Sequence, residues 1–133
     1  MKLKSGAGYA CYVKDIDKTA EFYEKLGLQI KERTSERLVI YLNWYRIDFF
    51  SAKEDLMPEF QKDTNSDNLG AGVFFYYSVD DVDETYKEMV KLGLKPTNEP
   101  ADQRWGNREF TICDPDGYKI VLFKRKVAKN PLD

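Results

Sequence analysis

The chain has 133 residues, of which 42% are hydrophobic and 33% charged, as expected for one globular domain with a real apolar core. The net charge of −2 provides no basic surface for nucleic acid. No apolar run approaches the roughly 20 residues that a membrane-spanning helix needs. Residues 1–6 lack the apolar core of a signal peptide. We therefore expect a cytoplasmic protein that binds neither nucleic acid nor membrane.

Two residue types limit the chemistry that is open to this chain. Histidine is absent, which excludes Ser-His-Asp and Cys-His nucleophiles, a histidine general base and histidine metal ligands. The two cysteines, Cys11 and Cys113, have neither metal-ligand spacing nor a disulfide framework. We predict that both are buried free thiols.

The first predicted elements are a strand and a helix. Residues 7–13 are mostly apolar or aromatic and predict the strand. Asp15 or Asp17 can cap the helix, and Gly27 stands where it should end. The apolar residues between them follow at helical spacing: Ile16, Ala20, Tyr23 and Leu26.

Three short strand-like runs follow the first helix, at about residues 29–33, 37–43 and 45–51. The first half thus predicts strand-helix-strand-strand-strand. Residues 52–69 are polar and predict a linker, with a short helix at 55–61.

The sequence then repeats itself with an offset of 66 residues. Residues 13–28 and 79–94 are identical at eight of their sixteen positions. Asp81 and Glu84 predict a capping box at the start of the second helix. Further strands are predicted at about 95–98, 107–113 and 118–124. The second half therefore has the same order of elements as the first.

The last two predicted strands are joined by Asp-Pro-Asp-Gly, residues 114–117. Pro115 presets φ for a turn, and Gly117 can adopt positive φ without a Cβ clash. These features predict a β-hairpin.

A duplicated βαβββ unit that ends in Asp-Pro-Asp-Gly-Tyr resembles the glyoxalase, bleomycin-resistance and extradiol-dioxygenase superfamily, also called the vicinal oxygen chelate superfamily. The resemblance covers about residues 6–125. It implies an α+β fold in which two βαβββ modules form an open barrel-like cleft, with the helices on the convex face. The single domain then comprises module 1 at about 6–51, a linker at 52–69 and module 2 at about 70–125.

Side chains alternate between the two faces of a strand, which allows a test of this arrangement. One set of positions is apolar, as expected beneath helices: Cys11, Val13, Ile47, Phe49, Phe75, Val79, Ile120 and Leu122. The other set is mixed, and we interpret it as the lining of a ligand cleft, the alternative being a half-solvated sheet face. It contains Gly8, Ala10, Tyr12, Arg46, Asp48, Phe50, Phe74, Tyr76, Ser78, Lys119, Val121 and Phe123.

Metal-dependent members of the superfamily take four ligands from the first and last strands of each module, and these are His or Glu in glyoxalase. Mapped by motif, the four positions here are Gly8, Asp48, Phe74 and Val121. Only Asp48 can bind a metal, and one carboxylate does not hold a catalytic divalent ion against water. We therefore expect no metal, no cofactor and no catalytic residue.

Members without metal ligands include the bleomycin-resistance proteins, which are homodimers that sequester a cationic drug in clefts between subunits. Their Trp-Gly-Arg-Glu-Phe run resembles residues 105–110 here, which are one residue longer. The resemblance implies that Trp105 stacks on planar rings of the ligand. It also implies a homodimer with an antibiotic-resistance role, which binds an aromatic or cationic small molecule without catalysis. The candidate ligand-binding residues are Trp105, Asp48, Phe50, Phe74, Tyr76, Tyr12 and Arg108.

Each candidate also has a purely structural interpretation. Trp105 could pin the hairpin to the body of the protein, and Phe74 and Tyr76 could simply fill a core. Asp48 could pair with a nearby arginine or lysine. Arg108 could form a structural salt bridge or a dimer contact.

Two other functions stay open at this point. One is a lyase or dioxygenase-type enzyme of the same superfamily, with an atypical metal site or none. The other is a non-catalytic stress or regulatory protein whose cleft is packed shut.

Overall fold

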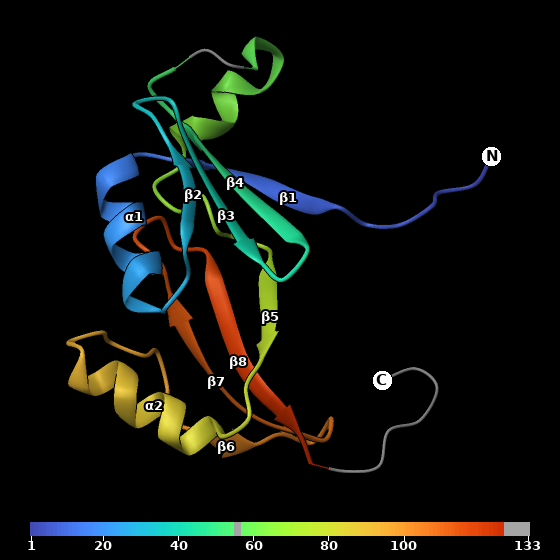
Figure 1. Ribbon diagram of the computed structural model, residues 1–133, viewed down its shortest axis with the longest axis vertical. Coiled ribbons are helices and arrows are strands. Elements are labelled where there is room, and N and C mark those ends of the chain that lie inside the picture. The colour runs from blue at the N-terminus through green and yellow to red at the C-terminus, as the bar shows by residue number, and fades with distance from the viewer. Residues whose placement is uncertain (55–56, 127–133) are drawn as a thin grey trace. The chain divides into compact units, whose positions relative to one another are not determined.

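The computed structural model describes residues 1–54 and 57–126, which fold as two compact units (Figure 1). The first unit is Met1–Leu69, and the second begins at Gly70. The first contains β1 (Gly8–Val13), α1 (Ile16–Lys25), β2 (Ile30–Arg33), β3 (Arg37–Leu42), β4 (Tyr45–Ser51) and the 3₁₀ helix η1 (Pro58–Asn65). The second contains β5 (Phe74–Ser78), α2 (Val82–Lys91), β6 (Ala101–Asp102), β7 (Asn107–Cys113) and β8 (Lys119–Arg125).

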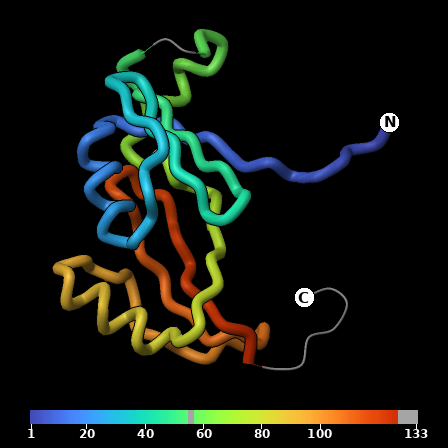
Figure 2. Tube along the Cα trace, in the orientation of Figure 1, coloured from blue at the N-terminus to red at the C-terminus, as the bar shows by residue number. Residues whose placement is uncertain are grey.

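Each unit has one four-stranded sheet, and the two sheets have the same topology. The strand orders are β1-β4-β3-β2 and β5-β8-β7-β6. The first strand of each unit runs parallel to the last, and the other pairs are antiparallel. Figure 2 shows the Cα trace through both units, coloured along the chain. The predicted α+β fold with two βαβββ modules is thus confirmed, whereas a cleft shared by the two modules stays a prediction.

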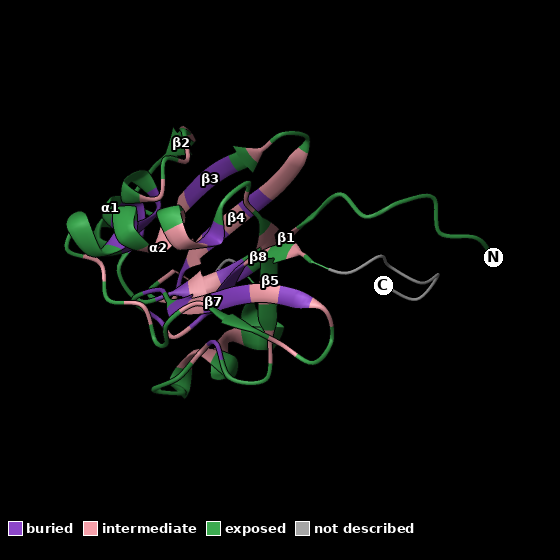
Figure 3. Ribbon diagram, turned by 90° about the horizontal axis from the view of Figure 1, so that it is seen from below, coloured by how far each residue is buried: buried purple, intermediate pink, exposed green. Residues whose placement is uncertain are grey.

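One helix covers one face of the sheet in each unit. Tyr23 of α1 packs against Phe49 of β4, with ring centroids 4.9 Å apart. Tyr86 of α2 meets Phe110 of β7 edge-on at 5.3 Å. Buried residues are concentrated on the strands, and the outer sides of the helices are exposed (Figure 3). Each fully buried large apolar side chain stabilises the fold by about 1.5–3 kcal/mol, so these layers dominate the stability of each unit.

Equivalent aspartates begin the two helices. Asp15 Oδ1 accepts a hydrogen bond from the Lys18 amide, and Asp81 Oδ1 accepts one from the Glu84 amide, both at 3.0 Å. The Lys18 amide bond lowers the pKa of Asp15. Asp15, not Asp17, is therefore the cap of α1. Both helices have ten residues, and no helix in the described ranges is long and apolar enough to cross a membrane.

The predicted strand at 95–98 is wrong, since the corresponding strand β6 is Ala101–Asp102. The Thr97 amide does donate to the Thr111 carbonyl at 2.7 Å. The Thr111 amide, however, donates to the side chain of Asn98 at 2.8 Å. Pro96 has no amide hydrogen, and Asn98 replaces a backbone acceptor with a side-chain oxygen, so no regular ladder forms.

Two further sequence predictions need revision. Residues 55 and 56 of the predicted helix at 55–61 lie outside the described residues, and the observed 3₁₀ helix runs over Pro58–Asn65. Both cysteines are free, and Cys11 is buried as predicted, but Cys113 is exposed. Cys113 is the last residue of β7, where it pairs with Lys119, and alternation places it on the same face of the sheet as Glu109, opposite α2.

The predicted hairpin joins β7 to β8, and Asp114 fixes its turn. The Gly117 amide donates to the Asp114 carbonyl at 3.0 Å, and Gly117 has a φ of 87°. The buried Asp114 carboxylate accepts from the amides of Asp116 and Tyr118, both at 2.9 Å. The turn thus depends on one side chain that satisfies two backbone donors.

We predict that Asp114→Ala lowers the free energy of unfolding by about 1–3 kcal/mol, because two buried amides lose their acceptor. Asp114→Asn keeps an acceptor oxygen in the same place and should lose clearly less. Urea unfolding of the three proteins measures the difference. Equal midpoints for Asp114→Ala and wild type would contradict this role for Asp114.

Candidate functional site

The face of the second sheet opposite α2 carries several large aromatic side chains. Phe74, Tyr76 and Trp105 are 55%, 49% and 47% exposed, which is unusual for rings of this size. Tyr76 also meets Phe123 of β8 edge-on, with centroids 5.7 Å apart. Glu109 of β7 lies on the same face, because it pairs in register with Phe123. We call Phe74, Tyr76, Trp105, Glu109 and Phe123 the aromatic face.

Trp105 lies in the loop between β6 and β7 and is fixed by two hydrogen bonds. Its indole Nε1 donates to Glu109 Oε2 at 3.3 Å, and its backbone carbonyl accepts from Arg125 Nη1 at 2.8 Å. Gly106, with a φ of 98°, lets the loop turn directly after the tryptophan. The structural and the ligand-binding interpretations of Trp105 are therefore compatible, since the edge of the ring is bonded while the side chain stays half-exposed.

Glu109 is the central polar residue of the aromatic face. The sequence points to it only as a possible acid-base residue of an enzyme, together with Asp48 or a tyrosine, and not as a ligand-binding residue. Its Oε2 accepts from Trp105 Nε1 and, at 3.1 Å, from Asn107 Nδ2. The residue is only 7% exposed. Within the described part of the chain, no lysine or arginine forms an ion pair with its carboxylate. Burial, and secondarily the negative charge of Glu109, raise the pKa of the Tyr76 hydroxyl.

Phe74 is the first residue of β5, and a lysine side chain lies over its ring. Lys119 Nζ stands 5.0 Å from the centroid of the Phe74 ring and donates to the Gly70 carbonyl at 2.9 Å. This cation–π contact fixes the lysine over one side of the ring. Trp105 is bonded to Glu109, Phe123 is its partner across the strands, and Tyr76 packs against Phe123.

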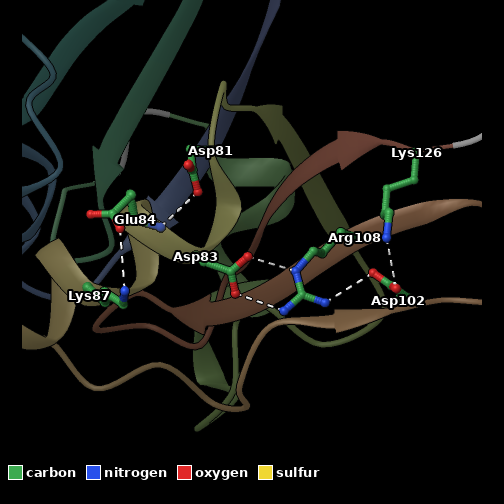
Figure 4. Close-up of polar contacts among 7 residues, drawn as sticks. All are labelled: Asp81, Asp83, Glu84, Lys87, Asp102, Arg108 and Lys126. Atoms are coloured by element: carbon green, nitrogen blue, oxygen red, sulfur yellow. Dashed lines mark hydrogen bonds and ion pairs between the residues drawn. The ribbon is translucent and has the colours of Figure 1, made fainter.

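Arg108 points to the other face of β7, towards α2 (Figure 4). Its guanidinium donates two hydrogen bonds to Asp83, at 2.9 and 2.8 Å, and one to Asp102 at 3.0 Å. Lys126 also pairs with Asp102, at 2.9 Å. These bonds raise the pKa of Arg108 and lower those of Asp83 and Asp102. The structure therefore places Arg108 in a salt-bridge network that ties the start of α2 to β6 and β7.

In the first unit, Asp48 is paired along its own strand. Arg46 donates to both carboxylate oxygens, at 2.6 Å from Nε and 3.1 Å from Nη2. The Asp48 side chain is 14% exposed. A shallow hollow of about 280 Å³ adjoins the pair and is lined by Ala7, Gly8, Tyr9, Ala10, Arg46 and Asp48. The arginine thus neutralises the charge that a ligand or a metal would need.

Tyr12 and Phe50 lie opposite each other on β1 and β4, both half-buried. The Tyr12 hydroxyl donates to the Met57 carbonyl at 3.2 Å. The candidate residues therefore divide between the units. The first unit holds Tyr12, Asp48 and Phe50, and the second holds Phe74, Tyr76, Trp105 and Arg108. Their convergence in one cleft stays a prediction.

The four mapped metal positions contain one carboxylate, and it is already bonded. Asp48 is held by Arg46, and Val121 is an apolar residue only 2% exposed. A Cβ at Gly8 would lie 1.9 Å from the Arg46 carbonyl oxygen, so no ligating side chain fits there. Within residues 1–54 and 57–126, no three Cys, Asp or Glu side chains form a group that could hold a metal. The donor set does not fit a catalytic divalent ion.

Residues 8–122 match the family model of the Glyoxalase/Bleomycin resistance protein/Dioxygenase superfamily. The chain belongs to this superfamily. A bleomycin resistance protein from Geobacillus stearothermophilus is 30% identical over 120 residues, which cover 85% of this chain and 91% of that protein.

Solved structures of the superfamily share the fold. A glyoxalase/bleomycin resistance protein/dioxygenase from Nocardioides superposes with a TM-score of 0.79 at 17% identity, over 98% of this chain and 90% of its own. A bleomycin-binding protein in complex with bleomycin gives a TM-score of 0.64 at 24% identity, over 92% of this chain and all of its own.

The salt bridges of Arg108 should make the stability of the protein depend on pH. The folded-state pKa of Asp83 is lowered, so its contribution to stability is present at neutral pH and is lost as pH falls from the ordinary aspartate range through the lower folded value. Asp83→Asn should therefore be less stable than wild type at neutral pH, and the gap should close on acidification.

Urea unfolding at a series of pH values measures this gap. Glu88→Gln is the matched control, because it removes a carboxylate from an exposed position of the same helix. A gap for Asp83→Asn that stays constant with pH would contradict the assignment.

Proposed function

We propose that the protein binds an aromatic or cationic small molecule on the aromatic face, without catalysing a reaction and without a metal. The observation that carries this proposal is Trp105, whose edge is bonded to Glu109 while the side chain stays half-exposed beside other exposed rings. The relatives named as bleomycin resistance proteins support the same class of function. The proposed role is sequestration of a toxic compound, which would give antibiotic resistance.

The geometry suits stacking of a flat ligand. Aromatic stacking adds roughly 0.5–1.5 kcal/mol beyond the area buried. Ordering a mobile side chain on binding costs roughly 0.5–1.5 kcal/mol, and this cost is reduced where the ring is already fixed. The bonds from Glu109 and Arg125 to Trp105 provide such fixation before any ligand arrives.

We also propose that the protein acts as a homodimer in the cytoplasm. The first strand of each unit, β1 or β5, is an edge of its own sheet. Edge strands in proteins are usually paired, covered or blunted. A second copy of the chain would cover such edges and enlarge the surface around a bound ligand.

A metal-dependent enzyme of the same superfamily is a poorer fit to the residues. The chain has no histidine, and the one carboxylate at the mapped metal positions is bonded to Arg46. Glu109 lies among aromatic rings with two neutral donors, which suits it to electrostatic attraction of a ligand.

The two tryptophans allow a direct test of where a ligand binds. Trp44 is 79% exposed and belongs to the turn between β3 and β4 in the first unit. In the Trp44→Phe variant, Trp105 is the one remaining tryptophan and gives the whole tryptophan fluorescence signal. Titration with bleomycin or 9-aminoacridine should quench this fluorescence. In Trp105→Phe the quenching should largely vanish, and Trp105→Ala should weaken binding several-fold by calorimetry. Loss of quenching in Trp44→Phe instead would place the ligand elsewhere.

Elemental analysis of protein purified without added metal tests metal independence. We expect no stoichiometric zinc, nickel, manganese or iron, and we expect ligand affinity to be unchanged after dialysis against a chelator. Asp48→Asn should also leave the affinity unaffected by chelator. Stoichiometric metal that is lost on chelation together with binding would favour an enzyme of the superfamily over a sequestering protein.

A further inference from the structure

We propose that Glu109 makes the aromatic face selective for ligands that carry a positive charge beside a flat ring. This inference rests on the proposed function and deepens it, because it assigns the charge of the ligand to one carboxylate. It also separates two roles of Glu109, which positions Trp105 through Oε2 and attracts the ligand through its net charge.

The hydrogen bonds of Glu109 leave its charge uncompensated. Its two donors are the neutral indole N–H of Trp105 and the neutral amide of Asn107, and both bind Oε2. In the described part of the chain, Oε1 has no hydrogen-bond partner and the carboxylate has no ion pair. Glu109 is only 7% exposed, so little of its surface is in contact with water.

The basic residues of the same face have partners other than this carboxylate. Lys119 Nζ binds the Gly70 carbonyl and lies over the Phe74 ring. Arg125 Nη1 binds the Trp105 carbonyl at 2.8 Å and Asn107 Oδ1 at 3.0 Å. Asn107 thus stands between the guanidinium and the carboxylate, accepting from one and donating to the other. A cationic ligand would therefore supply the first direct counter-charge to Glu109.

The rings around Glu109 favour the same kind of ligand. Cations are attracted to the faces of aromatic rings, and most strongly to tryptophan. Charge attraction is also stronger where solvent is excluded. The shift in the Tyr76 pKa, in part caused by Glu109, is a second sign that the field of this carboxylate reaches across the face.

Asp48 provides an internal comparison on the corresponding face of the first unit. Both of its oxygens are bonded to Arg46, so its charge is already matched. The two modules thus carry a carboxylate on equivalent sheet faces, and only that of Glu109 is left to a ligand.

The test uses two flat probes of similar shape at mildly alkaline pH, where 9-aminoacridine is a cation and acridine is neutral. Wild type should bind the cation on the order of tenfold more tightly than the neutral ring. Glu109→Gln keeps an oxygen that can accept from Trp105 and Asn107 but removes the charge. It should lose most of this preference while its affinity for acridine stays within about twofold of the wild-type value. Equilibrium dialysis measures all four affinities without relying on fluorescence.

Glu99→Gln is the charge-matched control, because Glu99 is exposed and precedes β6 outside the aromatic face. It should keep the wild-type preference, and circular dichroism confirms that each variant is folded. A wild-type protein that binds both probes equally would overturn the inference, as would a Glu109→Gln variant that keeps the preference or loses both affinities alike. In these cases the proposed function stands. If neither probe nor bleomycin binds wild type, the proposed function itself is wrong.

Discussion

Each half of this protein depends on the packing of one ten-residue helix against one four-stranded sheet. The helix can cover only one face, so the apolar positions of the strands are gathered there, around Phe49 in one unit and Phe110 in the other. The opposite face of each sheet is mixed, with polar and aromatic side chains beside a few buried residues such as Val121. A sheet of this kind commonly has one face packed and the other open to water. In the second unit that other face carries the exposed rings of the aromatic face.

The two modules differ in the side chains on the sheet face opposite the helix. The first has polar side chains that satisfy one another, Arg46 with Asp48. The second has exposed rings around a carboxylate whose partners are neutral. The two βαβββ units are thus similar frames with different surfaces. The ion-pair network around Arg108 keeps its charges on the helix side of the second frame and leaves the aromatic face undisturbed by them.

The fold could be predicted because its signals are local and occur twice. The helix caps, the Gly after each helix and the Asp-Pro-Asp-Gly turn each follow from the chemistry of a few neighbouring residues, and the repeat confirmed them against one another. The strand at 95–98 was predicted wrongly because a side chain substitutes for backbone there, as Asn98 does beside β7. Glu109 was not chosen as a ligand-binding residue because its importance comes from a contact with Trp105, which periodicity does not reveal. Alternation places Arg108 and Glu109 on opposite faces, but the pairing of Glu109 with Phe123 depends on the register of β7 and β8.

Gly8 limits which side chains the first unit can carry at the start of β1. The strands β1 and β4 approach so closely there that a Cβ would lie 1.9 Å from the Arg46 carbonyl oxygen, a distance that real side chains essentially never show. A mutation that introduced a metal ligand at this position would therefore first have to push the two strands apart. A single substitution at Gly8 cannot supply that ligand without a change in the backbone of the first sheet, whereas substitutions on the exposed rings of the second unit meet no such obstacle.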